Sequence, residues 1–215
     1  MIVTLIGTGA MARGIATRAL AGGHTVRLIG TDHRKAEDLA DQLRAHATSG
    51  AAVHASDAIG VEDADVVVLA LPYPAVVDVV ADYGTALAGS VLVDVSNPVD
   101  LATLDTLTVP PGTSAAERIA AEAAPGAPVV KAFNTTFAST LLTGQVAGQA
   151  LDVLIAGDAA DAKMTVAELA ASGGLRPLDV GPLRRARELE AFQLLHMAAQ
   201  DRLGLNWSSA IKILS

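Results

Sequence analysis

Residues 2–14 read IVTLIGTGAMARG, and this stretch decides the fold class of the chain. Ile2–Ile6 is a short apolar run rich in β-branched residues, which predicts a strand, and a glycine turn follows it directly. Ala10–Ala21 has helical composition and stops at Gly22-Gly23. A strand that leads through a glycine turn into a helix is the first half of a βαβ unit, from which parallel α/β sheets are built.

The turn has the spacing Gly7-x-Gly9-x-x-Ala12, and each position has a physical reason. Gly7 permits the tight turn, the missing side chain at Gly9 lets a pyrophosphate approach the backbone, and Ala12, together with Gly14 further along, keeps the helix close to the sheet. Free amides at a helix start bind phosphate. A turn without a ligand is the alternative, although it would not need small residues at all three positions. We therefore predict a dinucleotide site formed by Gly7, Thr8, Gly9, Ala10, Met11 and Ala12.

Strand-like runs and helical stretches continue to alternate along the chain. The run ADVVVLALP (64–72) is apolar throughout, which is typical of a strand buried on both faces of a parallel sheet. We therefore predict an α/β fold, a Rossmann-type doubly wound parallel sheet. The other predicted strands are 24–29, 51–54, 90–98 and 128–133, and the other helices are 35–46, 75–83 and 114–123.

The alternation becomes looser after about residue 150. Residues 151–157 and 175–181 predict strands, and 159–171 predicts the helix between them. Pro182 can occupy the first position of a long helix that ends at Leu203. We expect residues 1–150 to be the dinucleotide-binding domain and residues 151–215 to be a small, compact C-terminal α/β extension.

Composition excludes several classes of protein. The 215 residues carry a formal net charge of −8, which argues against a nucleic-acid partner because phosphate neutralisation requires a basic face. The chain has no cysteine, so it has no disulfide, thiolate nucleophile or cysteine-bound metal. Although 51% of residues are hydrophobic, no apolar run approaches the roughly 18 residues of a membrane span. The N-terminus lacks the basic leader of a signal peptide, so we expect a cytoplasmic protein without a membrane partner.

The segment after the second strand, GTDHRKAE, bears on the choice between NAD and NADP. An NAD site usually places an acid at the end of this strand to bind the ribose hydroxyls. Here that position is near Gly30, whereas Asp32 lies further into the loop. A hydroxyl and several cationic groups surround Asp32, and such groups suit a 2′-phosphate. We predict NADP, bound by Thr31, His33, Arg34 and Lys35; the alternative is a solvated helix start capped by Asp32.

Two further strand ends should face the same crevice, because ligands of such sheets lie beyond the carboxyl ends of the strands. The first contains Leu71, Pro72 and Tyr73, and the second contains Asn97 and Pro98. The prolines fix the backbone where it leaves the sheet, so that carbonyls can meet the nicotinamide ribose and carboxamide. Asn97 is a candidate for a hydrogen bond to the carboxamide; an Asn-Pro turn without ligand contact is the equal alternative.

We identify no catalytic residue and no metal site. The five histidines are scattered, and none has a partner at metal-ligand spacing. His196, with Glu190, Gln193 and Gln200 on neighbouring turns, is better explained as a packed histidine than as a proton donor. Hydride transfer between two bound rings requires stacking, orientation and exclusion of water more than a protein acid, whereas a carbonyl reductase needs a proton donor. The missing acid–base pair therefore favours transfer between two cofactors.

Five segments, in order, resemble the family of NADPH-dependent oxidoreductases typified by coenzyme F-420:NADP oxidoreductase (F420 hereafter). They are GTGAMARG, VVLALPYPAV, DVSNP, VVKAFNT and GGLRPLDVGPLRRARELE, and the most specific part is Gly174 to Leu183. The resemblance extends from Met1 to the C-terminal IKIL. It implies NADP(H) in the crevice, the deazaflavin F420 stacked on the nicotinamide as a small-molecule redox partner, and a homodimer. Residues 151–215 would complete the acceptor site and form the dimer face.

One segment departs from that family. Residues 133–137 read FNTTF, where the deazaflavin enzymes tend to carry a histidine, a threonine and an Ile-Pro pair. The KAFNT form is also similar to other dinucleotide-binding proteins, including the reductase domain of membrane ferric reductases. Contacts of Asn134 and Thr135 with the cofactor or its acceptor are expectations. The alternatives are an NADPH-dependent flavin, ferric or imine-type reductase, and a non-catalytic NADP(H)-binding sensor.

Overall fold

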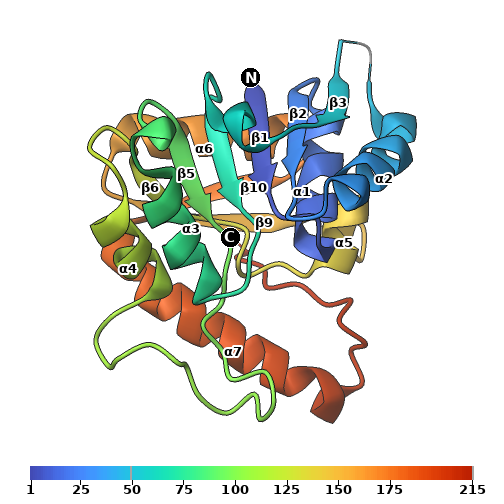
Figure 1. Ribbon diagram of the computed structural model, residues 1–215. Coiled ribbons are helices and arrows are strands. Elements are labelled where there is room, and N and C mark those ends of the chain that lie inside the picture. The colour runs from blue at the N-terminus through green and yellow to red at the C-terminus, as the bar shows by residue number, and fades with distance from the viewer. Residues whose placement is uncertain (49, 215) are drawn as a thin grey trace.

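The computed structural model describes residues 1–48 and 50–214, in which helices cover both faces of a central twisted sheet (Figure 1). Eight of the described strands form this sheet, in the order β10-β9-β6-β5-β4-β1-β2-β3. Their bounds are β1 (Ile2–Ile6), β2 (Thr25–Ile29), β3 (Ala52–Ala55), β4 (Val66–Leu69), β5 (Val91–Asp94), β6 (Val129–Lys131), β9 (Asp152–Gly157) and β10 (Arg176–Gly181). The strands β7 (Gln145–Val146) and β8 (Gln149–Ala150) form a separate hairpin.

Seven α-helices connect or follow these strands in the described part of the chain. They are α1 (Ala10–Ala21), α2 (His33–Leu43), α3 (Ala75–Tyr83), α4 (Ala115–Glu122), α5 (Ala138–Thr143), α6 (Ala160–Ser172) and α7 (Ala186–Leu203). Short 3-10 turns lie at Arg44–His46, Ala58–Val61, Gly84–Leu87 and Leu183–Arg185. None of the helices described here has both the length and the apolar character that crossing a membrane requires.

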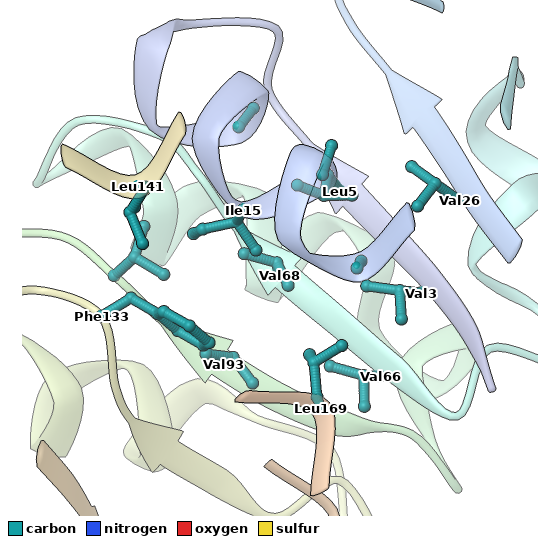
Figure 2. Packing of buried hydrophobic residues seen from close by; sticks show 14 of the residues in the cluster. Val3, Leu5, Ile15, Val26, Val66, Val68, Val93, Phe133, Leu141 and Leu169 are labelled. Carbon is teal, nitrogen blue, oxygen red and sulfur yellow. The ribbon is translucent and has the colours of Figure 1, made fainter. Parts of the chain in front are cut away.

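The strands β1 to β6 are parallel throughout, which confirms the predicted α/β fold class. Strand β4 shows why its sequence is apolar at every position. Val66 and Val68 belong to one hydrophobic core, with α1, α2 and α6, while Val67 and Leu69 belong to the other, with α3 and α4. Figure 2 shows the first core, where Ile15 of α1 lies over Val68 and Leu5.

The C-terminal region adds one antiparallel pair of strands to the predicted parallel sheet. Strand β9 pairs antiparallel with β6, and β10 then pairs parallel with β9, so residues 151–215 extend the same sheet. A run of apolar residues predicts a buried strand, but it carries no information about the direction of the neighbouring strand. The domain boundary at residue 150 stays a prediction.

Several element boundaries also differ from the predictions. Helix α2 begins at His33, because the Asp32 side chain accepts a hydrogen bond from Arg34 N at 3.1 Å and caps the helix. Pro182 precedes a 3-10 turn, and α7 begins only at Ala186. Helix α5 and the β7–β8 hairpin were not predicted. The tail after α7 returns to the sheet, where Asp152 accepts hydrogen bonds from Lys212 Nζ at 2.5 Å and Ile213 N at 2.8 Å.

Candidate functional site

The glycine turn lies at the carboxyl end of β1 and requires glycine for two reasons. Gly7 has a φ of +118°, and a Cβ at this position would lie 2.3 Å from the Ala70 carbonyl oxygen. Its amide donates to Ile29 O at 2.8 Å, so the turn is fixed against β2 and β4. Gly7 is therefore needed by the fold, whether or not a ligand binds.

Gly9 differs from Gly7, because nothing in the described protein fills the space beside it. It has an ordinary extended φ of −79°, precedes α1 and would carry a Cβ with no neighbour within 4 Å. No side chain caps the helix here. An open approach to the first amides of α1 is the arrangement that a pyrophosphate needs, so the turn fits a dinucleotide.

The predicted role of small residues in α1 needs one correction. Ala12 is fully buried against the sheet, as expected. Gly14, however, faces α5, since a Cβ on Gly14 would lie 2.8 Å from Leu141 Cβ. The small residue at 14 therefore allows two helices to pack, rather than bringing α1 onto the sheet.

A hollow of about 420 Å³ lies beside the turn, between α1 and α2. Lys35 lines it, as does Arg13, which sequence reasoning missed and whose guanidinium donates a hydrogen bond to Gln42 Oε1. Arg13 lies one helical turn after Gly9, on the side of α1 that faces α2, and this spacing was the available signal. Two cations and the carboxylate of Asp38 face the hollow; its remaining lining residues are Thr8, Gly9, Ala10, Leu39 and Gln42.

The other residues predicted for the 2′-phosphate do not line this hollow. Thr31 and Arg34 are exposed, and His33 Nε2 lies 3.5 Å from Glu37 Oε1. Asp32 serves as the helix cap described above, which was the structural alternative. Gly30 closely approaches the turn, since a Cβ there would lie 2.9 Å from Thr8 Cγ2. An acidic side chain at position 30, where an NAD site would place it, would have to displace Thr8.

The two proline-containing strand ends lie where expected, but their carbonyls are already engaged. Pro72 O accepts a hydrogen bond from Val76 N at 3.3 Å, and Pro98 O accepts one from Thr108 N at 2.6 Å. Leu71 and Tyr73 are half-buried and pack against the second core. Each of these carbonyl oxygens already accepts one hydrogen bond from the protein, and a carbonyl oxygen can accept two. The predicted contact of the strand-end carbonyls with the nicotinamide end stays a prediction.

The ends of β5 and β6 are joined by two asparagines. Asn134 Nδ2 donates to Asn97 Oδ1 at 2.9 Å, and Asn97 Nδ2 donates to Asn134 O at 3.0 Å. Asn134 and Thr135 are almost completely buried. Within the described residues, Ser96 Oγ and Asn134 Oδ1 are buried without a hydrogen-bond partner. These two unpaired polar atoms, at strand ends predicted to face the cofactor, fit a polar ligand group, because buried polar atoms are normally satisfied.

A buried ion cluster, which sequence reasoning missed, lies behind these asparagines. Lys131 Nζ donates to Asp94 Oδ2 at 2.8 Å and to Glu190 Oε1 at 2.7 Å, and all three side chains are completely buried. Burial raises the pKa of Glu190, and the opposite charge of Lys131 only partly offsets this. The available signal was a lysine within the buried strand PVVKAF, because a buried ammonium needs a carboxylate partner.

His196 is a packed histidine, as the residue pattern favoured. Its Nε2 lies 2.8 Å from Ser209 Oγ, and its ring stacks at 4.5 Å on Phe137, which also contacts Trp207. Burial lowers the pKa of His196. Gln193 and Gln200 adjoin it, but Glu190 points to Lys131 instead. In the part of the chain that the structure describes, no group of acidic or histidine side chains could hold a metal ion.

Comparison with known proteins gives a consistent set of relatives. The family model described as NADP oxidoreductase, coenzyme F420-dependent, matches residues 2–98. The F420-dependent NADP reductase of Methanothermobacter marburgensis is 34% identical over 214 residues, covering 94% of each chain. The crystal structure of a candidate F420-dependent NADP reductase from Arthrobacter sp. FB24 superposes with a TM-score of 0.80 and 29% identity, covering 99% of each chain.

A second kind of relative shares the dinucleotide-binding part. The metalloreductase STEAP3 of Rattus norvegicus is 36% identical over 192 residues. The match includes 89% of this chain but only 36% of the rat protein, so the chain spans about a third of that relative's length. Similarity to a metalloreductase agrees with the second reductase type that the KAFNT segment (131–135) suggested.

Proposed function

The chain belongs to the family of F420-dependent NADP reductases, and on this premise we propose that it transfers a hydride between NADP(H) and the deazaflavin coenzyme F420. It is an NADP-dependent oxidoreductase of this family, whose members use both cofactors. F420 as the acceptor is supported by the near full-length match to the Methanothermobacter enzyme. This match includes the C-terminal region that follows the dinucleotide-binding part.

We assign three groups of residues to NADP(H). The turn from Gly7 to Ala12 binds the pyrophosphate, and open space beside Gly9 supports this assignment. The 2′-phosphate is assigned to Lys35 and Arg13 in the hollow. We add Thr31, which precedes α2, and His33 and Arg34 in its first turn. The nicotinamide end is assigned to the strand ends that contain Leu71, Pro72, Tyr73, Asn97, Pro98, Asn134 and Thr135.

The protein's own contribution to this reaction is orientation. When bound, NADPH supplies the hydride, and the acceptor takes it up in its ring. The chain has to hold the nicotinamide at the edge formed by β5 and β6 and keep water away from it. The Asn97–Asn134 pair is suited to that task, because the Asn97 side chain is held by both the side-chain amide and the backbone carbonyl of Asn134.

The C-terminal region supports the proposal of a homodimer. Helix α7 carries Phe192, Leu195 and Leu203 on its surface, and their side chains are 43%, 66% and 67% exposed. These positions follow helical spacing along one side of α7. A second copy packed on this face would bury them beside the tail, which carries the exposed Trp207.

A ferric or flavin acceptor is the second candidate, and the similarity to STEAP3 favours it. An acceptor panel distinguishes the candidates: NADPH oxidation is followed with F420, free flavin and a ferric chelate, with NADH in parallel. The proposal expects F420 to be reduced fastest and NADPH to be preferred over NADH. NADPH binding without turnover on any acceptor would identify a sensor instead.

A further inference from the structure

The loop between β5 and α4 extends below the carboxyl ends of the strands in the view of Figure 1. It begins after Asp94, the last residue of β5, and reaches α4 at Ala115. Within it, Asp100 N donates to Thr106 O at 3.0 Å, so part of the loop folds back on itself. This loop bounds the nicotinamide end of the assigned site, and Asn97 is its first residue after Ser96.

The buried ion cluster holds the beginning of this loop. In addition to Asp94 and Glu190, the third partner of Lys131 Nζ is the carbonyl oxygen of Ser96, at 2.6 Å. Asp94 Oδ1 accepts from Ser96 N at 2.8 Å. One ammonium and one carboxylate thus hold the backbone of Ser96 on both sides, immediately before Asn97.

The same cluster holds the end of the loop. Glu190 Oε2 accepts from Ala115 N at 3.0 Å, and Glu190 Oε1 accepts from Ala116 N at 3.4 Å. These are the first amides of α4, where a carboxylate is favoured by the helix dipole. Lys131 and Glu190 contact each other at 2.7 Å, so one ion pair joins the two ends of the loop.

Stability alone gives a poor reason for this arrangement. A buried ion pair seldom stabilises a fold more than apolar side chains of similar volume, because removing two charges from water is costly. What apolar side chains could not do is bind the Ser96 carbonyl and the Ala115 amide at once. The cluster therefore specifies where the loop begins and ends.

We propose that Lys131 and Glu190 are positioning residues that clamp both ends of the loop at residues 96–115 and thereby hold Asn97 at the nicotinamide. The inference rests on the proposed use of NADP(H), but not on the identity of the acceptor. The pyrophosphate turn and the 2′-phosphate hollow lie on β1, α1 and α2, away from the clamp. Loss of the clamp should therefore affect only the nicotinamide half of the cofactor.

The test compares Glu190→Gln with Glu188→Gln, a matched change on the same helix. Glu188 is exposed and contacts Arg185, not the loop. Affinity is measured for NADPH and for 2′,5′-ADP, which lacks the nicotinamide half. We expect Glu190→Gln to lower the affinity for NADPH about 5- to 10-fold, which corresponds to the loss of about one hydrogen bond. Its affinity for 2′,5′-ADP should stay within about twofold of the wild-type value. Glu188→Gln should change neither affinity.

Hydrogen exchange of the ligand-free protein provides a second readout. The amides of Ala115 and Ala116 should lose protection in Glu190→Gln and keep it in Glu188→Gln. If Glu190→Gln does not fold, the combined variant Asp94→Asn, Lys131→Met, Glu190→Gln replaces it, because no buried charge is then left unpaired.

Equal weakening of NADPH and 2′,5′-ADP, or unchanged affinity and protection, would overturn the clamp. Failure of the wild-type protein to reduce F420 would refute the proposed acceptor instead. The clamp would still be decided by the affinities for NADPH and 2′,5′-ADP, which do not depend on the acceptor. Failure of the clamp and failure of the proposed acceptor are therefore distinguishable.

Discussion

Gly7 lies so close to Ala70 that a Cβ added to Gly7 would be 2.3 Å from the Ala70 carbonyl oxygen. Gly7 also has a φ of +118°, so any other residue here would have a strained backbone and a steric clash with Ala70. We expect Gly7→Ala to lower the free energy of unfolding by about 2–4 kcal/mol. Urea denaturation followed by circular dichroism measures this; an unchanged midpoint would contradict the described turn.

Gly9→Val should leave stability nearly unchanged but prevent binding of the cofactor. Because an added Cβ meets no protein atom within 4 Å, we expect the free energy of unfolding to change by no more than about 1 kcal/mol. The valine would occupy the space assigned to the pyrophosphate, so binding of NADPH should be abolished. Calorimetric titration beside the same denaturation experiment checks both parts. A stable variant that binds NADPH normally would refute the assignment of the turn.

Arg34→Ala combined with Lys35→Ala tests the 2′-phosphate assignment. Each cation is proposed to make a charge-assisted contact with that phosphate, so NADPH affinity should fall by about 100-fold while NADH affinity changes little. Arg44→Ala is the matched control, because Arg44 is exposed near the end of the same helix and pairs with Asp41. If the affinities for NADPH and NADH fall equally, Arg34 and Lys35 do not bind the 2′-phosphate.

Arg13→Met isolates the residue that the structure adds to this site. Methionine retains most of the apolar stem but not the guanidinium that faces the hollow. We expect NADPH affinity to fall about 10-fold, with NADH within about twofold. If the two affinities fall together, Arg13 supports the packing of α1 on α2 through Gln42 rather than the phosphate.

The buried carboxylate of Asp152 should make the free energy of unfolding depend on pH. Burial raises the pKa of Asp152, but hydrogen bonds from Lys212, the Ile213 amide and Arg176 outweigh burial and lower it overall. A folded-state pKa below the unfolded one means that the unfolded chain binds more protons at acidic pH. The stabilisation is therefore complete above the ordinary aspartate pKa of about 4 and is lost as pH falls through the lower folded value.

The matched measurement compares the wild type with Asp152→Asn in chemical denaturation between neutral and acidic pH. The wild type should be more stable at neutral pH, and the difference should shrink below about pH 4. A difference that grows on acidification would contradict the assigned direction of the pKa shift.

Local patterns predicted most of the fold. The bounds of β1, α1 and α3 agree with the prediction, because each depends on neighbouring residues: a β-branched run before glycines, small residues up to a glycine pair, and apolar spacing after prolines. The turn itself was also placed correctly at the end of β1.

What the sequence could not predict depends on partners that are distant along the chain. Lys131 meets Asp94 and Glu190 across 37 and 59 residues, and only the fold brings them together. The antiparallel pairing of β9 with β6 is likewise a tertiary contact. The engaged carbonyls of Pro72 and Pro98 depend on the following turns, which a strand pattern does not describe.

Direct hydride transfer between NADP(H) and F420 can be followed with isotope-labelled cofactor. The protein is mixed with F420 and with NADPH that carries deuterium at the transferred position, and the reduced deazaflavin is analysed by mass spectrometry. We expect F420 to lose its visible absorbance as NADPH is consumed, and the reduced deazaflavin to carry the deuterium. Absence of F420 reduction in either direction, or a reduced deazaflavin without deuterium, would contradict direct transfer.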